Sequence, residues 1–185
     1  MNVILDLDNT LLCAIEMDFY KKNKKNFELL DQKLDKIEMD VSYRIYERPH
    51  LHEFLEYVFS NFNVCIFTAA SKDYALFIFD NIIKKHVRNA TVDVFLHYYH
   101  TELSEQYYNS PKDLRLLWDK FPTNFKPSNT IIVDDLKDVK EANGYNCINI
   151  KGFEVVDEEN GEVNNTSIKD NELLNVMQVL ELSKL

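Results

Sequence analysis

The sequence predicts an α/β fold in which helices flank a central parallel sheet. Three short apolar runs, at residues 3–5, 64–67 and 130–133, contain β-branched residues and lie far apart in the chain. Runs of this length between polar residues are typical of strands that are buried on both faces. Segments with helical periodicity separate these runs, and strands that alternate with helices favour a parallel sheet.

The segment after the first strand predicts a polar insertion. Residues 16–40 are polar and include the lysine-rich run 21–25, which we interpret as a solvent-exposed loop or helix face. Residues 41–46 then show the alternation that is typical of a half-exposed strand. We expect an antiparallel hairpin or flap beside the first strand.

One helix is predicted before the second strand in the sequence, and another is predicted after it. Arg48-Pro49-His50 opens the first helix, because proline is favoured in a first helical turn. Ser71 can cap the second helix, which we place at about residues 74–85. The apolar residues that recur at helical spacing in these two segments are Leu51, Phe54, Leu55, Val58, Phe59, Ala75, Phe79, Ile82 and Ile83.

The C-terminal half predicts further strands and helices. Residues 91–99 are rich in β-branched and aromatic side chains and predict at least one strand, and a helix should begin at residues 112–114. A final short strand is expected at 146–150. A polar, acidic segment follows at 157–165, and an amphipathic helix at about 170–183 should dock on the rest of the domain.

Length and charge limit the possible functions. The 185 residues, 45% of them hydrophobic and 28% charged, are typical of one globular domain. The net charge of −10 disfavours sequence-independent binding to nucleic acid, which requires a basic surface. We therefore do not expect direct binding to nucleic acid.

The sequence also bears on the cellular compartment. No apolar run has the length of a membrane span, and no signal peptide is visible. The three cysteines are an odd number without metal-binding spacing, which favours free thiols in a reducing compartment. We expect an intracellular protein, cytoplasmic or nuclear, that is neither secreted nor bound to a membrane.

Chemically useful side chains follow each buried strand. Asp6 and Asp8 follow the first, Thr68 follows the second, and Asp134 and Asp135 follow the third. Because parallel strands end at the same edge of a sheet, we expect these side chains to meet there. Clustered carboxylates repel one another, and a hard divalent cation with oxygen ligands, for which we expect Mg²⁺, relieves that repulsion.

This set of residues suits phosphoryl transfer. The hydroxyl of Thr68 and the ammonium of Lys112 can hold phosphate oxygens. Asp6 and Asp8 lie two residues apart, so in an extended segment their side chains point the same way and can share one site. One carboxylate can attack phosphorus to form an aspartyl-phosphate, and the other can protonate the leaving oxygen and later accept a proton from water.

A calcium-binding loop would also contain Asp-x-Asp. Counted from Asp6, an EF-hand loop needs glycine at position 11 and an acid at position 17, where this chain has Leu11 and Met17. A strand rather than a helix also precedes the motif. We therefore reject the calcium-loop interpretation.

Four segments occur in an order that resembles the motifs of the haloacid-dehalogenase (HAD) superfamily phosphatases. They are Asp-Leu-Asp-Asn-Thr-Leu at 6–11, Phe-Thr-Ala-Ala-Ser at 67–71, Pro-Lys-Asp-Leu at 111–114 and Ile-Ile-Val-Asp-Asp at 131–135. More narrowly, residues 48–55 and 67–75 resemble the small RNA polymerase II C-terminal-domain (CTD) phosphatases. The resemblance runs from residue 1 to about residue 150.

The resemblance implies a particular form of the α/β fold. It implies one HAD-like phosphatase domain over residues 1–185, with a Rossmann-like core and no large cap domain. A small β flap or insert is expected at about residues 13–46, and a second insert at about 91–108. The helix at about 170–183 would dock on the core.

Motif by motif, the resemblance assigns different roles to the first two acids. Asp6 is expected to be the nucleophile and a metal ligand through its carboxylate. Asp8 is expected to be the general acid and base, and a metal ligand through its backbone carbonyl. These roles come from the resemblance and not from the spacing.

The remaining site residues follow in the same way. Thr68, Ala69 and Lys112 are expected to bind phosphate. Asp134 and Asp135 are expected to hold the metal, one of them through water. Relatives often carry asparagine at the second position of this pair, so Asp135 adds a negative charge.

The resemblance implies a Mg²⁺-dependent phosphatase that hydrolyses phosphoserine or phosphothreonine in proteins through an aspartyl-phosphate. The substrate would be a phosphoprotein or phosphopeptide, such as the C-terminal domain of RNA polymerase II. Two alternatives stay open. One is the same chemistry on a nucleic-acid end or a small phosphometabolite, and the other is a catalytically silent binding module.

Overall fold

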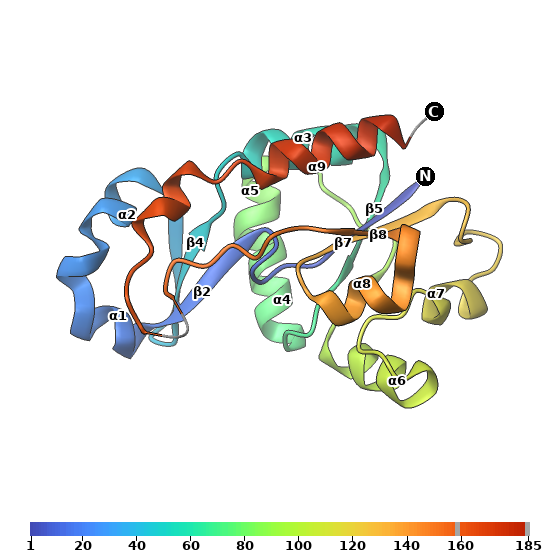
Figure 1. Cartoon of the computed structure of the whole chain (residues 1–185), viewed down its shortest axis with the longest axis horizontal. Coiled ribbons are helices and arrows are strands. Elements are labelled where there is room, and N and C mark those ends of the chain that lie inside the picture. The colour runs from blue at the N-terminus through green and yellow to red at the C-terminus, as the bar shows by residue number, and fades with distance from the viewer. Residues whose placement is uncertain (158–159, 184–185) are drawn as a thin grey trace.

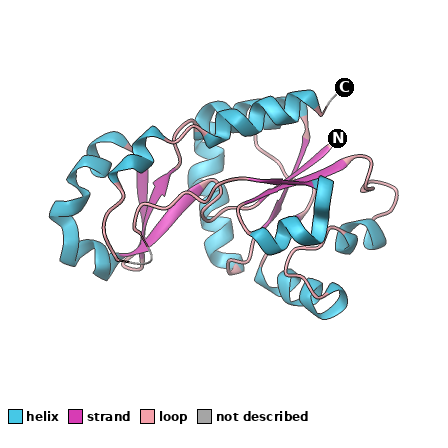
Figure 2. Ribbon diagram, in the orientation of Figure 1, coloured by secondary structure: helices cyan, strands magenta, loops and turns pink. Residues whose placement is uncertain are grey.

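The computed structural model describes residues 1–157 and 160–183, and it contains two sheets (Figures 1 and 2). The larger has five strands in the order β6-β5-β1-β7-β8, and every pair of neighbours is parallel. The smaller has three antiparallel strands in the order β2-β4-β3. The predicted fold class is confirmed.

The three predicted apolar runs form the middle of the central sheet. The five strands are β1 (Asn2–Leu5), β5 (Asn63–Phe67), β6 (Phe95–Leu96), β7 (Thr130–Asp134) and β8 (Cys147–Asn149). Every residue of β1 is buried. Leu5 pairs with Ile66 on one side and with Val133 on the other. This register brings the ends of β1, β5 and β7 to the same edge of the sheet.

Two hydrophobic clusters cover the two faces of the sheet. Because side chains alternate along a strand, Val3 and Leu5 enter one cluster and Ile4 enters the other. The first cluster contains residues of α3 (Leu51–Asn61), α4 (Lys72–Ile78) and α9 (Glu172–Leu182). The second contains residues of α7 (Arg115–Lys120) and α8 (Lys137–Asn143). The remaining segments around the sheet are η2 (Phe79–Ile83), α5 (Lys84–His86), α6 (Tyr98–Tyr108), η3 (Gly144–Asn146) and η4 (Asn165–Lys169).

The small antiparallel sheet belongs to an insert between β1 and α3, which lies at the left of Figure 1. It has its own core around Phe27, Leu30 and Tyr46. Asp31 and Arg44 form an ion pair at 2.6 Å inside it. The insert consists of β2 (Leu12–Glu16), α1 (Met17–Asn23), η1 (Lys24–Phe27), α2 (Glu28–Lys33), β3 (Lys36–Met39) and β4 (Tyr43–Glu47).

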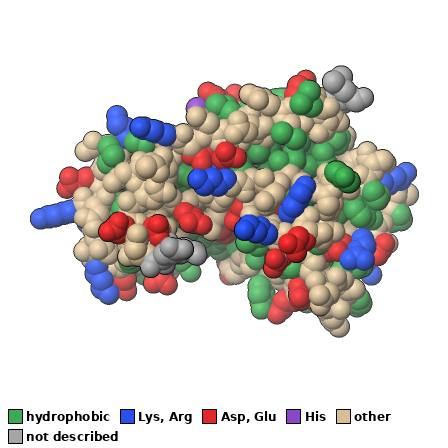
Figure 3. Space-filling model, in the orientation of Figure 1, with side chains coloured by type: hydrophobic (Ala, Val, Ile, Leu, Met, Phe, Trp, Pro, Cys, Tyr) green, Lys and Arg blue, Asp and Glu red, His purple; other side chains and the backbone are tan. Residues whose placement is uncertain are grey.

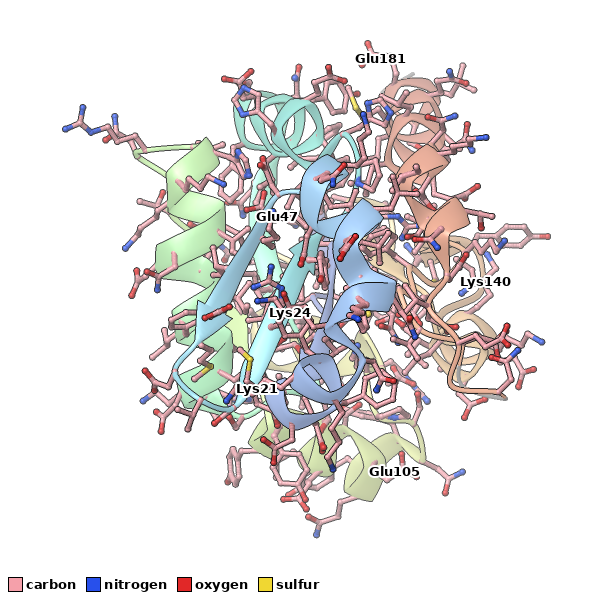
Figure 4. All side chains as sticks on the ribbon, turned by 90° about the vertical axis from the view of Figure 1, so that its left-hand side faces the viewer. Lys21, Lys24, Glu47, Glu105, Lys140 and Glu181 are labelled. Carbon is pink, nitrogen blue, oxygen red and sulfur yellow. The ribbon has the colours of Figure 1, made fainter. Side chains whose placement is uncertain are left out.

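The lysine-rich run lies on α1 and η1, and its lysines are exposed, as the polar pattern predicted. Figure 4 views the insert end-on, with Lys21 and Lys24 on the side that faces the viewer. Figure 3 shows acidic and basic side chains interspersed over the face of Figure 1 rather than one large basic field.

The strand predicted at 91–99 is shorter than expected, because α6 begins at Tyr98. Only Phe95 and Leu96 pair with β5. The helix starts there because the His100 ring accepts a hydrogen bond from the His97 backbone N–H at 3.1 Å, closing a reciprocal cap. The segment 91–108 therefore provides one strand of the central sheet and one helix.

Other segments also differ from the expectations. Helix α8 was not predicted, because its seven residues bury only Val139 and Asn143 and so carry little periodicity. The helix expected from 112–114 begins at Arg115, where Asp113 Oδ1 accepts from the Arg115 backbone N–H at 2.8 Å. Residues 158 and 159 of the predicted acidic segment lie outside the described residues. Within the described ranges, no helix is long and apolar enough to cross a bilayer.

Candidate active site

Three adjacent strands deliver the predicted site residues to one edge of the central sheet. Asp6 directly follows β1, Thr68 directly follows β5, and Asp134 is the last residue of β7. The neighbouring strands of β1 are β5 and β7, so all three residues converge although the sequence separates them widely. This edge is where open parallel sheets place their ligands.

Three carboxylates lie close together at this edge. Oxygen atoms of Asp6, Asp134 and Asp135 lie within 4.8 Å of one another. Asp6 is 4% exposed and Asp134 is fully buried. The Thr10 hydroxyl lies 3.1 Å from Asp6 Oδ2 and 3.0 Å from Asp135 Oδ1, and it can donate to one of them.

Lys112 bridges two of these carboxylates. Its Nζ donates to Asp6 Oδ1 at 2.6 Å and to Asp134 Oδ2 at 2.7 Å, and the residue is only 1% exposed. Burial by itself lowers the pKa of the ammonium, but the charges of Asp6 and Asp134 outweigh this and raise the pKa. Lys112 is therefore charged and holds both acids in place.

Asn143 of α8 fixes the backbone around Lys112. Its side-chain amide donates to the Lys112 carbonyl at 2.9 Å and accepts from the Leu114 backbone N–H at 2.9 Å. This contact could not be predicted, because α8 was not predicted and a single asparagine in a sequence does not indicate its partner. Through Asn143, α8 thus fixes the backbone of Lys112.

The acidic cluster fits a hard divalent cation. Asp6, Asp134 and Asp135 contribute three negative charges and Lys112 one positive charge, which leaves two negative charges for a cation to balance. Burial, and then the charge of Asp6, raise the pKa of Asp134 to about 7 and also raise the pKa of Asp135. Carboxylate oxygens are the ligands that Mg²⁺ prefers.

Asp8 turns away from this cluster. The Tyr74 hydroxyl donates to Asp8 Oδ1 at 2.5 Å. Burial raises the pKa of Asp8 to about 6, while the hydrogen bond from Tyr74 opposes that rise. Asn9, the next residue, has a left-handed backbone with φ of 58°. Asp6 and Asp8 therefore differ in their partners, because Asp6 bonds to Lys112 and Asp8 bonds to Tyr74.

A cavity of about 360 Å³ opens beside Asp8. The residues that line it with Asp8 come from the insert, from the loop after β5 and from α4: Ala14, Tyr43, Ala70, Ser71 and Tyr74. In the sequence, Tyr74 is only the first residue of a predicted helix, next to the apolar residue Ala75. The contact between Tyr74 and Asp8 was therefore missed.

The two expected phosphate-binding residues of the second motif follow β5. Thr68 is buried, and its hydroxyl accepts from the Ala70 backbone N–H at 3.1 Å. Ala69 is exposed next to it. The structure places both at the edge that holds the acids, while the hydroxyl of Thr68 is engaged with its own loop.

Arg48 ties the loop that follows Asp8 to the C-terminal part of the chain. Its guanidinium donates to the Thr10 carbonyl at 2.9 Å and to the Lys151 carbonyl at 2.7 Å. It also forms a two-pronged ion pair with Asp170 at 2.8 and 2.9 Å. In the sequence, Arg48 is recognisable only as part of a helix start and of a family motif.

Comparison with known proteins gives a consistent family assignment. The family model described as NLI interacting factor-like phosphatase matches residues 1–184. A CTD phosphatase-like protein, 355R, of Invertebrate iridescent virus 3 is 37% identical over 187 residues, covering 98% of this chain and 96% of the relative. The 355R protein of Invertebrate iridescent virus 6 is 35% identical, with coverages of 97% and 96%. An FCP1 homology domain-containing protein of Schizosaccharomyces pombe is 30% identical, with coverages of 82% and 60%.

Solved structures show the same fold. Fcp1, an essential RNA polymerase II CTD phosphatase, superposes with a TM-score of 0.67 at 19% identity. Fission yeast Fcp1-R271A bound to beryllium fluoride superposes with a TM-score of 0.61 at 22% identity. Each match covers 98% of this chain but only 61% and 51% of the two Fcp1 chains, so Fcp1 is much longer.

Proposed function

The chain belongs to the NLI interacting factor-like phosphatases, and we propose that it removes phosphate from phosphoserine or phosphothreonine in proteins with the help of Mg²⁺. The observation that carries this proposal is the buried Lys112 between Asp6 and Asp134, with Asp135 in the same cluster. Burying this many charged groups is costly for a fold. Such clusters are typical of sites that bind or transfer charged groups.

Asp6 is the proposed nucleophile. Its carboxylate oxygen forms a bond to phosphorus while the bond between phosphorus and the serine or threonine oxygen breaks. The Lys112 ammonium orients the Asp6 carboxylate, because it holds Oδ1 at 2.6 Å. When bound by Asp6, Asp134, Asp135 and the Asp8 carbonyl, Mg²⁺ supplies positive charge against the phosphoryl oxygens.

Asp8 is the proposed proton carrier. In the first step it gives a proton to the leaving oxygen, and in the second it takes a proton from the water that attacks phosphorus. The bond from phosphorus to Asp6 then breaks and inorganic phosphate leaves. A pKa of about 6 suits both directions near neutral pH.

Phosphate oxygens would be held by side chains and backbone already at this edge. Thr68 can offer its hydroxyl, Ala69 its backbone N–H, and Lys112 a third ammonium hydrogen. Two of the ammonium hydrogens of Lys112 already bond to Asp6 and Asp134. A phosphate held in this way would lie next to the proposed nucleophile.

The choice of a protein substrate rests on the relatives. Two viral relatives that this chain matches over nearly their whole length are named CTD phosphatase-like. We therefore propose a phosphoprotein or phosphopeptide substrate, such as the C-terminal domain of RNA polymerase II. Residues 1–157 and 160–183 form no large cap domain, which agrees with access by a protein segment.

The mechanism is tested with para-nitrophenyl phosphate in the presence and absence of Mg²⁺. We expect phosphate release that needs Mg²⁺ and that Asp6→Asn lowers by at least about 1,000-fold, because the nucleophile is lost. The exposed Asp80→Asn serves as the matched control and should keep full activity. Turnover by Asp6→Asn at near the normal rate would rule out Asp6 as the nucleophile.

The substrate class is tested by comparing kcat/KM on a panel. Phosphoserine and phosphothreonine peptides should be turned over faster than a 3′-phosphorylated oligonucleotide or a sugar phosphate. Faster turnover of the oligonucleotide or the sugar phosphate would assign the same chemistry to another substrate. If the protein releases phosphate from none of these substrates in the presence of Mg²⁺, the alternative of a catalytically silent binding module would be favoured.

A further inference from the structure

Tyr74 makes the only side-chain hydrogen bond to Asp8 within the described residues. Its hydroxyl donates to Oδ1 at 2.5 Å, and no donor in the described part of the chain bonds to Oδ2. One oxygen of the carboxyl group is therefore fixed and the other is free. Nothing in the proposed mechanism so far accounts for this contact.

The fold holds Tyr74 firmly in place. Ser71 caps α4, and its hydroxyl accepts from the Tyr74 backbone N–H at 3.4 Å. The side chain is nearly buried. The Tyr43 ring, at the start of β4 in the insert, packs edge-on against the Tyr74 ring at 5.7 Å between centroids. Contacts with α4 and with the insert therefore both orient the Tyr74 hydroxyl.

We propose that Tyr74 is a positioning residue that orients Asp8 for proton transfer to and from the leaving oxygen. The inference rests on the proposed function, because it concerns the role of Asp8 in that reaction. Tyr74 holds Oδ1, and Asp8 lines the cavity together with Ala14, Ala70 and Ser71. The oxygen that leaves the phosphorus would lie in this cavity.

If Tyr74 orients Asp8, its contribution to the rate should be larger for a leaving group that needs a proton to depart. The oxygen of serine or threonine leaves poorly as an alkoxide, so its departure depends on a well-placed acid. The para-nitrophenolate ion leaves without a proton. Tyr74 therefore adapts the site to alkyl phosphate esters, the class to which phosphoserine and phosphothreonine belong.

The test compares Tyr74→Phe with the wild-type protein on these two kinds of ester, both with Mg²⁺. We expect kcat on a phosphoserine peptide to fall about 10- to 100-fold, because misplacing an acid loses part of its catalytic effect. On para-nitrophenyl phosphate the loss should be less than about threefold. The ring remains, so the packing against Tyr43 is kept.

Tyr57→Phe is the matched control. The Tyr57 hydroxyl also donates to a carboxylate, Glu181, at 2.6 Å, but it does so on the exposed surface between α3 and α9. This variant should turn over both substrates at the wild-type rate. The melting temperatures of both variants confirm that each is folded.

A double-mutant cycle separates positioning from a general structural effect. If Tyr74 acts through Asp8, adding Tyr74→Phe to Asp8→Asn should cause no further loss on the phosphoserine peptide. Equal losses on the two esters, or additive losses in the double variant, would overturn the inference while leaving the proposed function intact. A wild-type protein that hydrolyses neither ester would instead refute the proposed function and, with it, this role of Tyr74.

Discussion

At the scale of single residues, the site is a balance among buried charges. Lys112 is the cation that faces both Asp6 and Asp134, and all three side chains are almost completely buried. An isolated buried charge costs several kcal/mol, whereas a paired one costs much less. The lysine therefore stabilises the folded protein before any substrate arrives.

Replacing Lys112 should destabilise the protein strongly at neutral pH. Lys112→Met keeps the length of the side chain but leaves two buried acids without a partner, so we expect a loss of about 3 kcal/mol. Urea unfolding at about pH 7.5 measures this. The loss should shrink toward about pH 5, where Asp134 takes up a proton. The exposed Lys126→Met is the control, and equal stability of the two variants would contradict this prediction.

Removing the charge of Asp8 should stabilise the folded protein, in contrast to the loss of Lys112. Burial raises the pKa of Asp8 from 3.8 to about 6, so the folded state binds this proton more tightly than the unfolded state. The ionised form destabilises the folded protein fully above about pH 6, and the penalty disappears as the pH falls toward 3.8.

Asp8→Asn should therefore stabilise the metal-free protein at about pH 7.5, by at most about 3 kcal/mol. The gain should fall below about 1 kcal/mol at about pH 4, where Asp8 is protonated in the folded state and partly protonated in the unfolded state. Thermal unfolding at the two pH values in the presence of a chelator measures it. A stabilisation that does not depend on pH would show that charge is not its cause.

At the scale of secondary-structure elements, the C-terminal segment supports the loop that follows Asp8. Asp170 precedes α9 and pairs with Arg48, which holds the carbonyl groups of Thr10 and Lys151. Asp170 also accepts from the Glu172 backbone N–H at 3.0 Å at the start of α9. One aspartate thus links the docking of α9 to the turn after Asp8.

Breaking this link should cost much more than breaking a surface ion pair. Asp170→Asn leaves the fully buried Arg48 without its charged partner, and we expect a loss of about 3 kcal/mol in the free energy of unfolding. Asp80→Asn removes the exposed pair with Lys84, which should cost no more than about 0.5 kcal/mol. Urea denaturation measures the loss for each variant. Similar losses would mean that the ion pair between Arg48 and Asp170 contributes no more to stability than an exposed pair does.

At the scale of the whole molecule, the site lies where the central sheet meets the insert. Phe153 and Val155 follow β8 but pack in the hydrophobic core of the insert, so the chain crosses between the two parts more than once. The molecule carries a net charge of −10 and still concentrates three carboxylates at one edge. A bound cation should therefore stabilise the molecule as a whole.

Mg²⁺ should raise the melting temperature. At about 100 times its dissociation constant it adds about 2.7 kcal/mol of stability, or roughly 5–10 °C for a chain of this size. The rise should be larger at about pH 7.5 than at about pH 5, because protons compete for the buried acids at low pH. Asp135→Asn should reduce the rise, whereas the exposed Asp138→Asn should leave it unchanged. An unchanged melting temperature with Mg²⁺ would argue against the metal site.

The sequence by itself determined the fold class and the order of the site residues. Apolar runs such as 64–67 and helical spacing such as that of Phe54 and Val58 depend on neighbours in the chain, so they can be read locally. Short elements such as β3 and α8 could not be read, because four to seven residues give too little periodicity. The residues that follow the strands were found because the end of a strand is itself a local signal.

Only the tertiary structure decided which atoms meet. Lys112 bonds to Asp6 across 106 residues of sequence, and Tyr74 bonds to Asp8 across 66. Such contacts depend on strand order, on register and on the packing of the insert, and none of these is encoded in the spacing of a motif. The sequence therefore identified Asp6 and Asp8, whereas the tertiary packing determined that Asp6 bonds to Lys112 and Asp8 to Tyr74.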